Sequence, residues 1–285
     1  MYRLEKALFT GFITFCIFIS LNSAVFAAKK NTKTPINNQF HALNFVPYNQ
    51  VPGDQDVNLG NLQIKREVTG TAVISPDMRK VAYTKTFFYP MNLHTAGKLF
   101  YINPGPLDFL DDLNKTLTPA QLSNIFKIEK ADNPGIEIMS AGTENFDNHI
   151  FRTLTIVDWS QDSRKILIKE AVGEHYRGIW RTNLWVYDFS VKKAKRLDEV
   201  RNAVVFYWKK KYKSFLNDYR WDIVPLGWDY ENPDIIIVNA YGYNKYDKEF
   251  LGCWGVDYRG RRVQLLSQDI ENRHVGQNGM VLVEK

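Results

Sequence analysis

The chain has little cysteine and few of the residue spacings that hold metals. Only Cys16 and Cys253 occur in 285 residues, and neither Cys-x-x-Cys nor His-Glu-x-x-His is present. No two of the five histidines stand four residues apart, so the sequence does not support a zinc site. A Gly-x-Ser-x-Gly elbow and a phosphate-binding glycine loop are missing too. We therefore expect no metal and no cofactor, and we assign no catalytic residue.

One stretch does alternate oxygen ligands as a calcium loop would. Asp54, Asp56 and Asn58 have the spacing of the first ligands, but Leu59 and Lys65 stand where such a loop has Gly and Glu. The stretch therefore does not predict a calcium site.

Long apolar runs are also scarce, and the one at residues 7–21 follows the basic residues Arg3 and Lys6. Small residues lead to Ala27, so we expect a signal peptide over residues 1–27 and export to the periplasm or beyond. An uncleaved membrane anchor is the alternative, although the run is shorter than the roughly 20 residues a span needs. Cleavage would leave no transmembrane segment and would make nucleic acid an improbable partner.

Residues 28–39 are polar and predict a flexible leader ahead of a single domain over residues 40–285. Cys253 is then the only remaining cysteine, so the core must depend on burial rather than on a disulfide. Its neighbours Gly252 and Trp254 indicate a small buried residue.

The chain is 45% hydrophobic and 14% aromatic, which favours a folded β-rich domain. Residues 72–83, 157–168 and 226–237 align without gaps, and an aromatic residue recurs 25 positions after each origin and Asn or Asp 28 positions after it. The origins are Ser75, Ser160 and Asp229, the aromatic residues are Phe100, Trp185 and Trp254, and the third set is Asn103, Asp188 and Asp257. At 37 positions the second and third copies have Leu197 and Leu266, whereas the first has Asp112.

Each copy predicts four antiparallel strands joined by tight turns, in repeats near residues 68–104, 151–200 and 220–267. Asp188 and Asp257 stand at a strand end, where we expect them to serve the turn.

These repeats resemble the blades of TolB-like, WD40-like (PD40-type) β-propellers, whose turn reads Ser-Pro-Asp-Gly. Ser75-Pro76-Asp77 matches closely and Ser160-Gln161-Asp162 partly, but Met78, Ser163 and Pro233 replace the turn glycine. The resemblance implies an all-β fold of irregular or incomplete propeller-like repeats.

The repeat origins lie 85 and 69 residues apart, which exceeds the 40–45 typical of a blade. Between the first two repeats, residues 106–130 favour one or two short helices, with Thr118 as N-cap. Closure of a ring needs further strands. The candidates are residues 62–69, 136–140, 203–208 and 280–283. An open, sandwich-like β assembly is the alternative.

Propeller geometry would gather the turns between strands one and two and between strands three and four on one face. That face would be basic and suited to an anionic surface or polymer, although solvated turns are the simpler interpretation. Its residues are Arg79, Lys80, Arg164, Lys165, Lys192, Lys193, Lys195, Arg196, Arg259, Arg261 and Arg262.

The opposite face would carry long loops with aromatic residues that stack on sugars or anchor a protein. The alternative is that the extra residues lengthen the middle hairpin and their rings pack on one another. The predicted ligand-binding residues are Phe88, Tyr89, His94, His175, Tyr176, Trp180, Tyr241, Tyr243 and Tyr246.

Together these features favour an exported, non-catalytic module that binds a glycan or an envelope protein through aromatic loops. A carbohydrate-active propeller enzyme and a structural envelope component are the alternatives. The oligomeric state and the ligand are not indicated.

Overall fold

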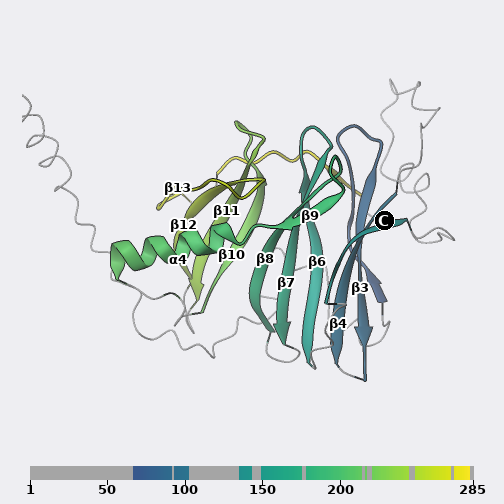
Figure 1. The fold of residues 1–285 in the computed structure, drawn as a ribbon, viewed down its shortest axis with the longest axis horizontal. Coiled ribbons are helices and arrows are strands. Elements are labelled where there is room, and N and C mark those ends of the chain that lie inside the picture. The colour runs from purple at the N-terminus through teal and green to yellow at the C-terminus, as the bar shows by residue number, and fades with distance from the viewer. Residues whose placement is uncertain are drawn as a thin grey trace, which may run out of the picture. The chain divides into compact units, whose positions relative to one another are not determined.

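The computed structural model describes residues 67–91, 93–102, 135–142, 149–174, 178–213, 216, 220–243, 248–270 and 273–282. The chain divides into two compact units, residues 1–37 and 38–285, and all described residues belong to the second. The predicted signal peptide, polar leader and helical insertion lie outside the described residues, as does the calcium-like stretch. Within the described ranges the elements are fourteen strands and one helix (Figure 1). The all-β class is therefore confirmed.

The first two predicted repeats lie in one ten-stranded sheet. Its strands are β1 (Glu67–Thr69), β2 (Ala72–Ile74), β3 (Val81–Tyr89), β4 (His94–Ile102), β5 (Ile136–Ala141), β6 (Ile150–Trp159), β7 (Lys165–Glu174), β8 (Gly178–Asp188), β9 (Lys193–Arg196) and β14 (Met280–Leu282). Consecutive strands from β2 to β5, and again from β6 to β9, pair antiparallel. The two groups join where Thr95 of β4 pairs parallel with Phe151 of β6.

The third predicted repeat forms a separate four-stranded antiparallel sheet. Its strands are β10 (Trp221–Trp228), β11 (Ile235–Tyr243), β12 (Lys248–Asp257) and β13 (Val263–Ser267). The helix α4 (Glu199–Tyr212) connects the two sheets along the chain. The described residues do not close either sheet on itself, because β14 and β9 end the first and β10 and β13 end the second.

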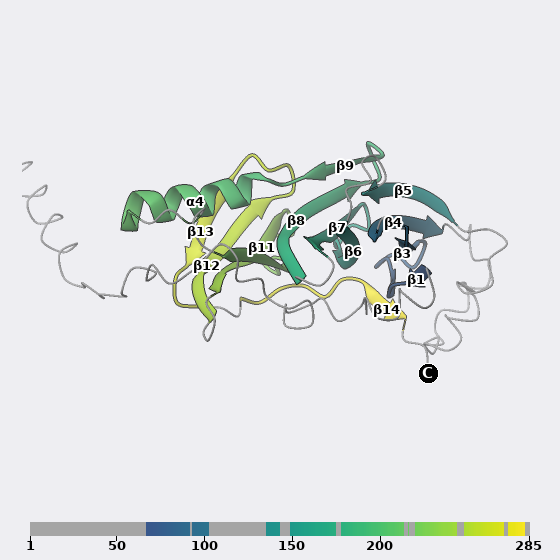
Figure 2. The same cartoon turned by 90° about the horizontal axis from the view of Figure 1, so that it is seen from below.

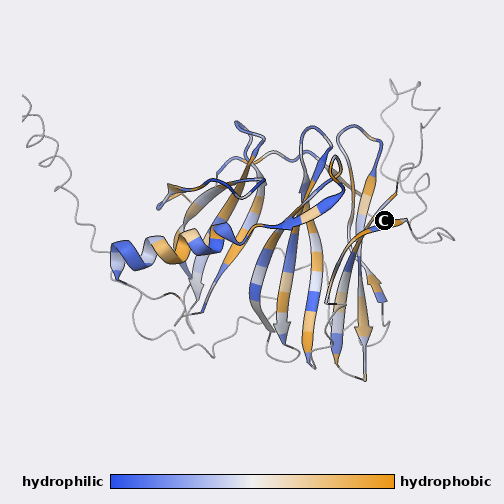
Figure 3. Cartoon of the chain, in the orientation of Figure 1, coloured by the Kyte–Doolittle hydropathy of each residue, from blue (hydrophilic) through white to orange (hydrophobic). Residues whose placement is uncertain are grey.

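Strand β7 is buried on both faces, and its charged residues Lys169 and Glu170 are buried together with its apolar ones. On one face Ile166 and Ile168 pack in a core with Ala82 and Leu99 of β3 and β4. Strand β10 of the second sheet is in contact with β8 and β6, the two neighbours of β7. Figure 3 shows hydrophobic and hydrophilic residues following one another along these strands.

The turns before β3 and before β7 form the same hydrogen bonds, which accounts for the aligned sequences. Ser75 donates to Asp77 (2.6 Å) as Ser160 donates to Asp162 (2.5 Å). Each serine hydroxyl also accepts the N–H of the lysine five residues later, at 2.9 Å in both turns.

The third turn is one residue longer than the other two. Asp229 N–H donates to Ile235 C=O, whereas the equivalent bond in the second turn joins Ser160 to Lys165. The third strand nevertheless ends at the same offset, because Asp257 pairs with Ile235 as Asp188 pairs with Lys165. The extra residue is therefore absorbed in the turn.

The chain's last described segment runs past the first strands of all three groups (Figure 2). Gly276 donates to Trp228 C=O at the end of β10 (2.9 Å). Gly279 donates to Asp158 of β6 (2.8 Å), and β14 then pairs antiparallel with β2. We call residues 273–282 the C-terminal strap.

The supplementary strands predicted from sequence were correct in three cases and wrong in one. Residues 136–140 lie in β5, residues 280–282 form β14, and residues 67–69 form β1. Residues 203–208 instead belong to α4. This segment is helical because Val200, Val204 and Trp208, which are spaced four residues apart, are buried along one face of the helix. No helix among the described residues has the length and apolarity to span a membrane.

Candidate functional site

The turns that carry the predicted basic residues contact one another at one end of the sheets (Figure 1). Asp77 N–H donates to Ser163 Oγ (2.9 Å), which joins the turns before β3 and β7. Tyr258 N–H donates to Asp234 C=O (3.1 Å), which joins the turns after β12 and β10. We call this end the basic end; it comprises the turns β2–β3, β6–β7, β8–β9 and β12–β13.

One contact between turns occurs twice with equivalent residues. Lys80 Nζ lies 5.6 Å from the ring centroid of Phe189, and Lys165 Nζ lies 4.5 Å from that of Tyr258. Each lysine is five residues after its repeat origin, and each ring is 29 residues after the origin of the next repeat. Strands β2–β5 therefore contact strands β6–β9 in the same way as strands β6–β9 contact the second sheet.

The carboxylates of these turns are directed to the backbone. Asp188 accepts the N–H of Ser190 (2.8 Å) and Asp257 that of Arg259 (2.8 Å). Both therefore serve the turn, as their position predicts.

Asp77 and Asp162 are engaged in the same way within their own turns. Burial by itself raises the pKa of Asp77, but hydrogen bonds from Ser75 and the Arg79 N–H, with the charge of Lys80, outweigh it and hold the pKa below its ordinary value. The pKa of Asp162 is lowered against the same burial effect by Ser160, Arg164 N–H and Lys165.

Several predicted basic residues are neutralised locally. Lys80 pairs with Asp77 and Lys165 with Asp162. Lys165 is only 8% exposed, so its assignment to an open basic face was wrong: its ammonium lies over the Tyr258 ring instead. On β9, Lys195 pairs with Glu199 (3.4 Å), and Arg196 pairs with Asp198 (2.7 Å).

Seven other predicted basic residues are exposed on these turns. Arg259 donates to the Tyr258 hydroxyl (2.8 Å). The remaining six make no ion pair with the described residues. They are Arg79, Arg164, Lys192, Lys193, Arg261 and Arg262. The exposed acids Glu231 and Asp234 belong to the neighbouring β10–β11 turn.

The aromatic residues predicted to bind a ligand are mostly inside the sheets where the structure describes them. Phe88, His94, Tyr241 and Tyr243 are buried, and His94 Nε2 lies 2.5 Å from Gly142 C=O. Their placement on a recognition surface was therefore wrong. Tyr89 alone is exposed, at 38%.

The physical reason is the one given as the alternative: the middle hairpins are long. Strands β3 and β4 pair as far as Tyr89 and His94, and β11 and β12 as far as Tyr243 and Lys248. Rings therefore lie on sheet faces, and Tyr241 packs on Phe250 at 5.6 Å. His175, Tyr176 and Tyr246, and the side chain of Trp180, lie outside the described residues.

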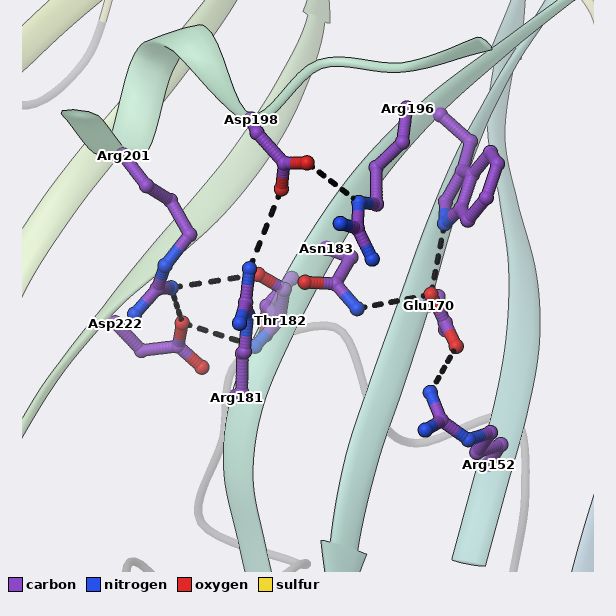
Figure 4. Close-up of polar contacts among 10 residues, drawn as sticks. Arg152, Glu170, Arg181, Thr182, Asn183, Arg196, Asp198, Arg201 and Asp222 are labelled. Atoms are coloured by element: carbon purple, nitrogen blue, oxygen red, sulfur yellow. Dashed lines mark hydrogen bonds and ion pairs between the residues drawn. The ribbon is translucent and has the colours of Figure 1, made fainter. Parts of the chain in front are cut away.

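A buried polar network joins the two sheets and α4 (Figure 4). Asp222 of β10 is 1% exposed. Its Oδ1 accepts the N–H of Thr182 on β8 (3.0 Å) and a guanidinium N–H of Arg201 on α4 (2.6 Å). Arg201 also lies 4.3 Å from the Trp221 ring. One carboxylate thus holds three elements together.

Glu170 is the second buried carboxylate of this region. Its Oε2 accepts from Asn183 (2.9 Å) and Trp185 Nε1 (2.8 Å), and its Oε1 pairs with Arg152 (2.9 Å). Sequence reasoning missed both carboxylates. The available signal was an acid in a run of buried apolar residues, because a buried charge requires partners.

Cys253 is buried, as predicted, and burial raises the pKa of its thiol. Among the residues that the structure describes, no three His, Cys, Asp or Glu side chains lie together in a way that could hold a metal ion.

No protein-family model matches this chain, and no curated protein matches it. Among solved structures, the chain is 10% identical to one described as the Bacillus megaterium YpeB C-terminal domain. That similarity covers 73% of this chain and 93% of that chain, with a TM-score of 0.13. A TM-score this low does not indicate a shared fold.

Proposed function

We propose that this protein is an exported, non-catalytic docking module that binds an acidic polymer, of the acidic-glycan class, through its basic end. The observation that supports the proposal best is the division of charge there. The turn carboxylates accept backbone and hydroxyl hydrogen bonds, whereas six exposed cations have no acid partner among the described residues.

This difference between the carboxylates and the cations matters, because cations that are all paired with acids would attract an anionic polymer only weakly. Cations left unpaired near one another create a local positive potential larger than the net charge of +6 implies. The six are spread over four turns, each anchored to its neighbours. Separated, fixed cations fit a chain that carries an anionic group at intervals.

The predicted propeller-like organisation belongs to this proposal. It is supported by the repeated contact of Lys80 with Phe189 and of Lys165 with Tyr258, since a constant step from one antiparallel strand group to the next gives equivalent contacts. Such an arrangement would present turns of every module on one side.

The export component rests on residues 1–27 and is supported by sequence alone. A sugar-stacking site that includes His175, Tyr176, Trp180 and Tyr246 stays a prediction.

Heparin, a sulfated glycan, is the probe for the test. A double substitution, Arg261→Gln with Arg262→Gln, removes two unpaired cations from the basic end. We expect it to elute from a heparin column at clearly lower salt, because each lost contact to an anionic group weakens salt-dependent binding.

The matched control is Lys85→Gln with Lys98→Gln on β3 and β4, which makes the same change in net charge outside the basic end and outside α4. Equal elution shifts for both variants would overturn the proposal, because they would show attraction by net charge alone. No retention of the parent protein would overturn it as well.

A further inference from the structure

Helix α4 is fixed to the second sheet by its inner face (Figure 2). Val200 and Val204 are buried, and Trp208 Nε1 donates to Leu251 C=O of β12 (3.0 Å). In the last turn of the helix, Lys211 donates to Gln268 Oε1 (2.8 Å). The helix is therefore held in one orientation and presents a defined outer face.

That outer face combines one large aromatic side chain with several lysines. Phe206 is 66% exposed. Asn202 lies one turn before it and Lys210 one turn after it, both exposed. Lys213, also exposed, follows directly after the helix, where its φ of 57° ends the helical turns. Lys209 is exposed beside them. The only acid in α4 is Glu199 in its first turn, so no carboxylate of the helix neutralises this face.

The lysines alone have an ordinary explanation, because cations near a helix C-terminus interact favourably with its carbonyl ends. That explanation does not extend to Phe206. Single exposed apolar residues are common on protein surfaces, but Phe206 stands on a helix face whose other exposed residues are polar or cationic. The combination of ring and cations on one rigid helix face is what points to a ligand.

We infer that the outer face of α4 binds the surface of a membrane containing anionic phospholipid. In that contact the Phe206 ring enters the boundary between headgroups and acyl chains, and the ammonium groups of Lys210 and Lys213 meet lipid phosphates. Lysine suits this role because it is a flexible point charge, whereas planar, bidentate recognition favours arginine.

Charge complementarity and shape select this occupant. A protein partner would normally need an apolar patch wider than one ring, with pockets for its own side chains. A lipid surface accepts a single aromatic residue surrounded by cations, because lipids rearrange around it. This face is separate from the basic end, so the inference stands or falls independently of the proposed function.

The test is sedimentation of the full chain with vesicles of phosphatidylcholine alone or of phosphatidylcholine with phosphatidylglycerol. Every variant has the same N-terminus, so any contribution of residues 7–21 is common to all. We expect Phe206→Ala to lower partitioning onto anionic vesicles about tenfold, from the loss of one buried aromatic side chain. Lys210→Gln should lower it roughly fivefold.

Val191→Ser provides the matched control. Val191 is also an exposed apolar residue beside two lysines, but it stands in the β8–β9 turn of the basic end. We expect this variant to partition like the parent. Alanine favours helix more than phenylalanine does, so Phe206→Ala should fold, and its circular dichroism and melting temperature check this.

Two outcomes would overturn the inference. One is the absence of any difference between the two vesicle compositions. The other is loss of binding in Val191→Ser with normal binding in Phe206→Ala, which would assign lipid contact to the basic end.

Discussion

Asp158 and Asn278 are 120 residues apart, yet the Asp158 carboxylate accepts hydrogen bonds from both the backbone N–H of Asn278 (3.1 Å) and its side-chain amide (3.2 Å). The same amide donates to Trp159 C=O (2.9 Å), and Gly279 N–H donates to Asp158 (2.8 Å). This contact fastens the C-terminal strap to the end of β6, midway between its contacts with β10 and β2. We expect it to couple the three strand groups.

Asp158→Ala should lower the free energy of unfolding by about 3 kcal/mol, because it leaves several buried N–H groups unpaired. Asn278→Ala should cost about 1–2 kcal/mol, since it removes two hydrogen bonds at a less buried residue. Urea unfolding of both variants and of the double variant measures their coupling. If the two effects simply add, the strap does not depend on this contact.

Asp77 should make stability depend on pH in acid. Its folded-state pKa lies below the ordinary value of 3.8, so its ionised form stabilises the fold above that value, and the contribution is lost as pH falls through the lowered pKa. Asp77→Asn should therefore destabilise the protein at pH 7 and progressively less below pH 3.8. Melting temperatures of both proteins across this range provide the measurement.

Asp158 has the opposite sign and serves as the comparison. Burial raises its pKa despite hydrogen bonds from Gly279, Asn278 and Trp159 N–H, so its favourable contribution from this shift is present in acid and lost as pH rises through the raised value. Asp158→Asn should cost least at neutral pH by this effect. Parallel pH profiles for the two variants would contradict both assignments.

The sequence predicted the strands and the turns because both depend on local residues. Ser75 and Asp77 appear in the chain as the turn that they form, and apolar runs mark β7 and β11. Helix α4 was missed because its buried positions, Val200 and Val204, are β-branched residues that favour strands. The segment is nevertheless a helix, because burying this face against β12 outweighs the local preference for a strand.

The partners of buried polar groups were beyond local reasoning. Nothing near Asp158 in the chain indicates Asn278, and nothing near Asp222 indicates Arg201. The same limit applies to the aromatic loops, where strand length rather than composition determined that Tyr241 and Tyr243 would be buried. In each case the outcome depends on contacts between residues far apart in the sequence or on how far two strands pair.

Met78 has a φ of 59° in the turn where the resembled repeats have glycine. A side chain in this left-handed region is strained by about 1 kcal/mol. Met78→Gly should therefore be more stable than Met78→Ala by about 1 kcal/mol, since both lose the same packing of the longer side chain. Chemical unfolding measures the difference. At Arg79, which is not in this region, the order should reverse, with alanine more stable than glycine.

Glu170→Gln tests the buried network directly. Both carboxylate oxygens of Glu170 accept hydrogen bonds, from Arg152 on one side and from Asn183 and Trp185 on the other. An amide can accept on one side only, so its NH₂ group must face a donor, and the Arg152 charge loses its partner. We expect the free energy of unfolding to fall by about 2–3 kcal/mol. Glu199→Gln is the matched control, because its ion pair with Lys195 is exposed and its loss should cost less than about 1 kcal/mol. Similar losses in urea unfolding for the two variants would show that burial of Glu170 contributes nothing special, and that the network does not hold the strands of the first sheet together.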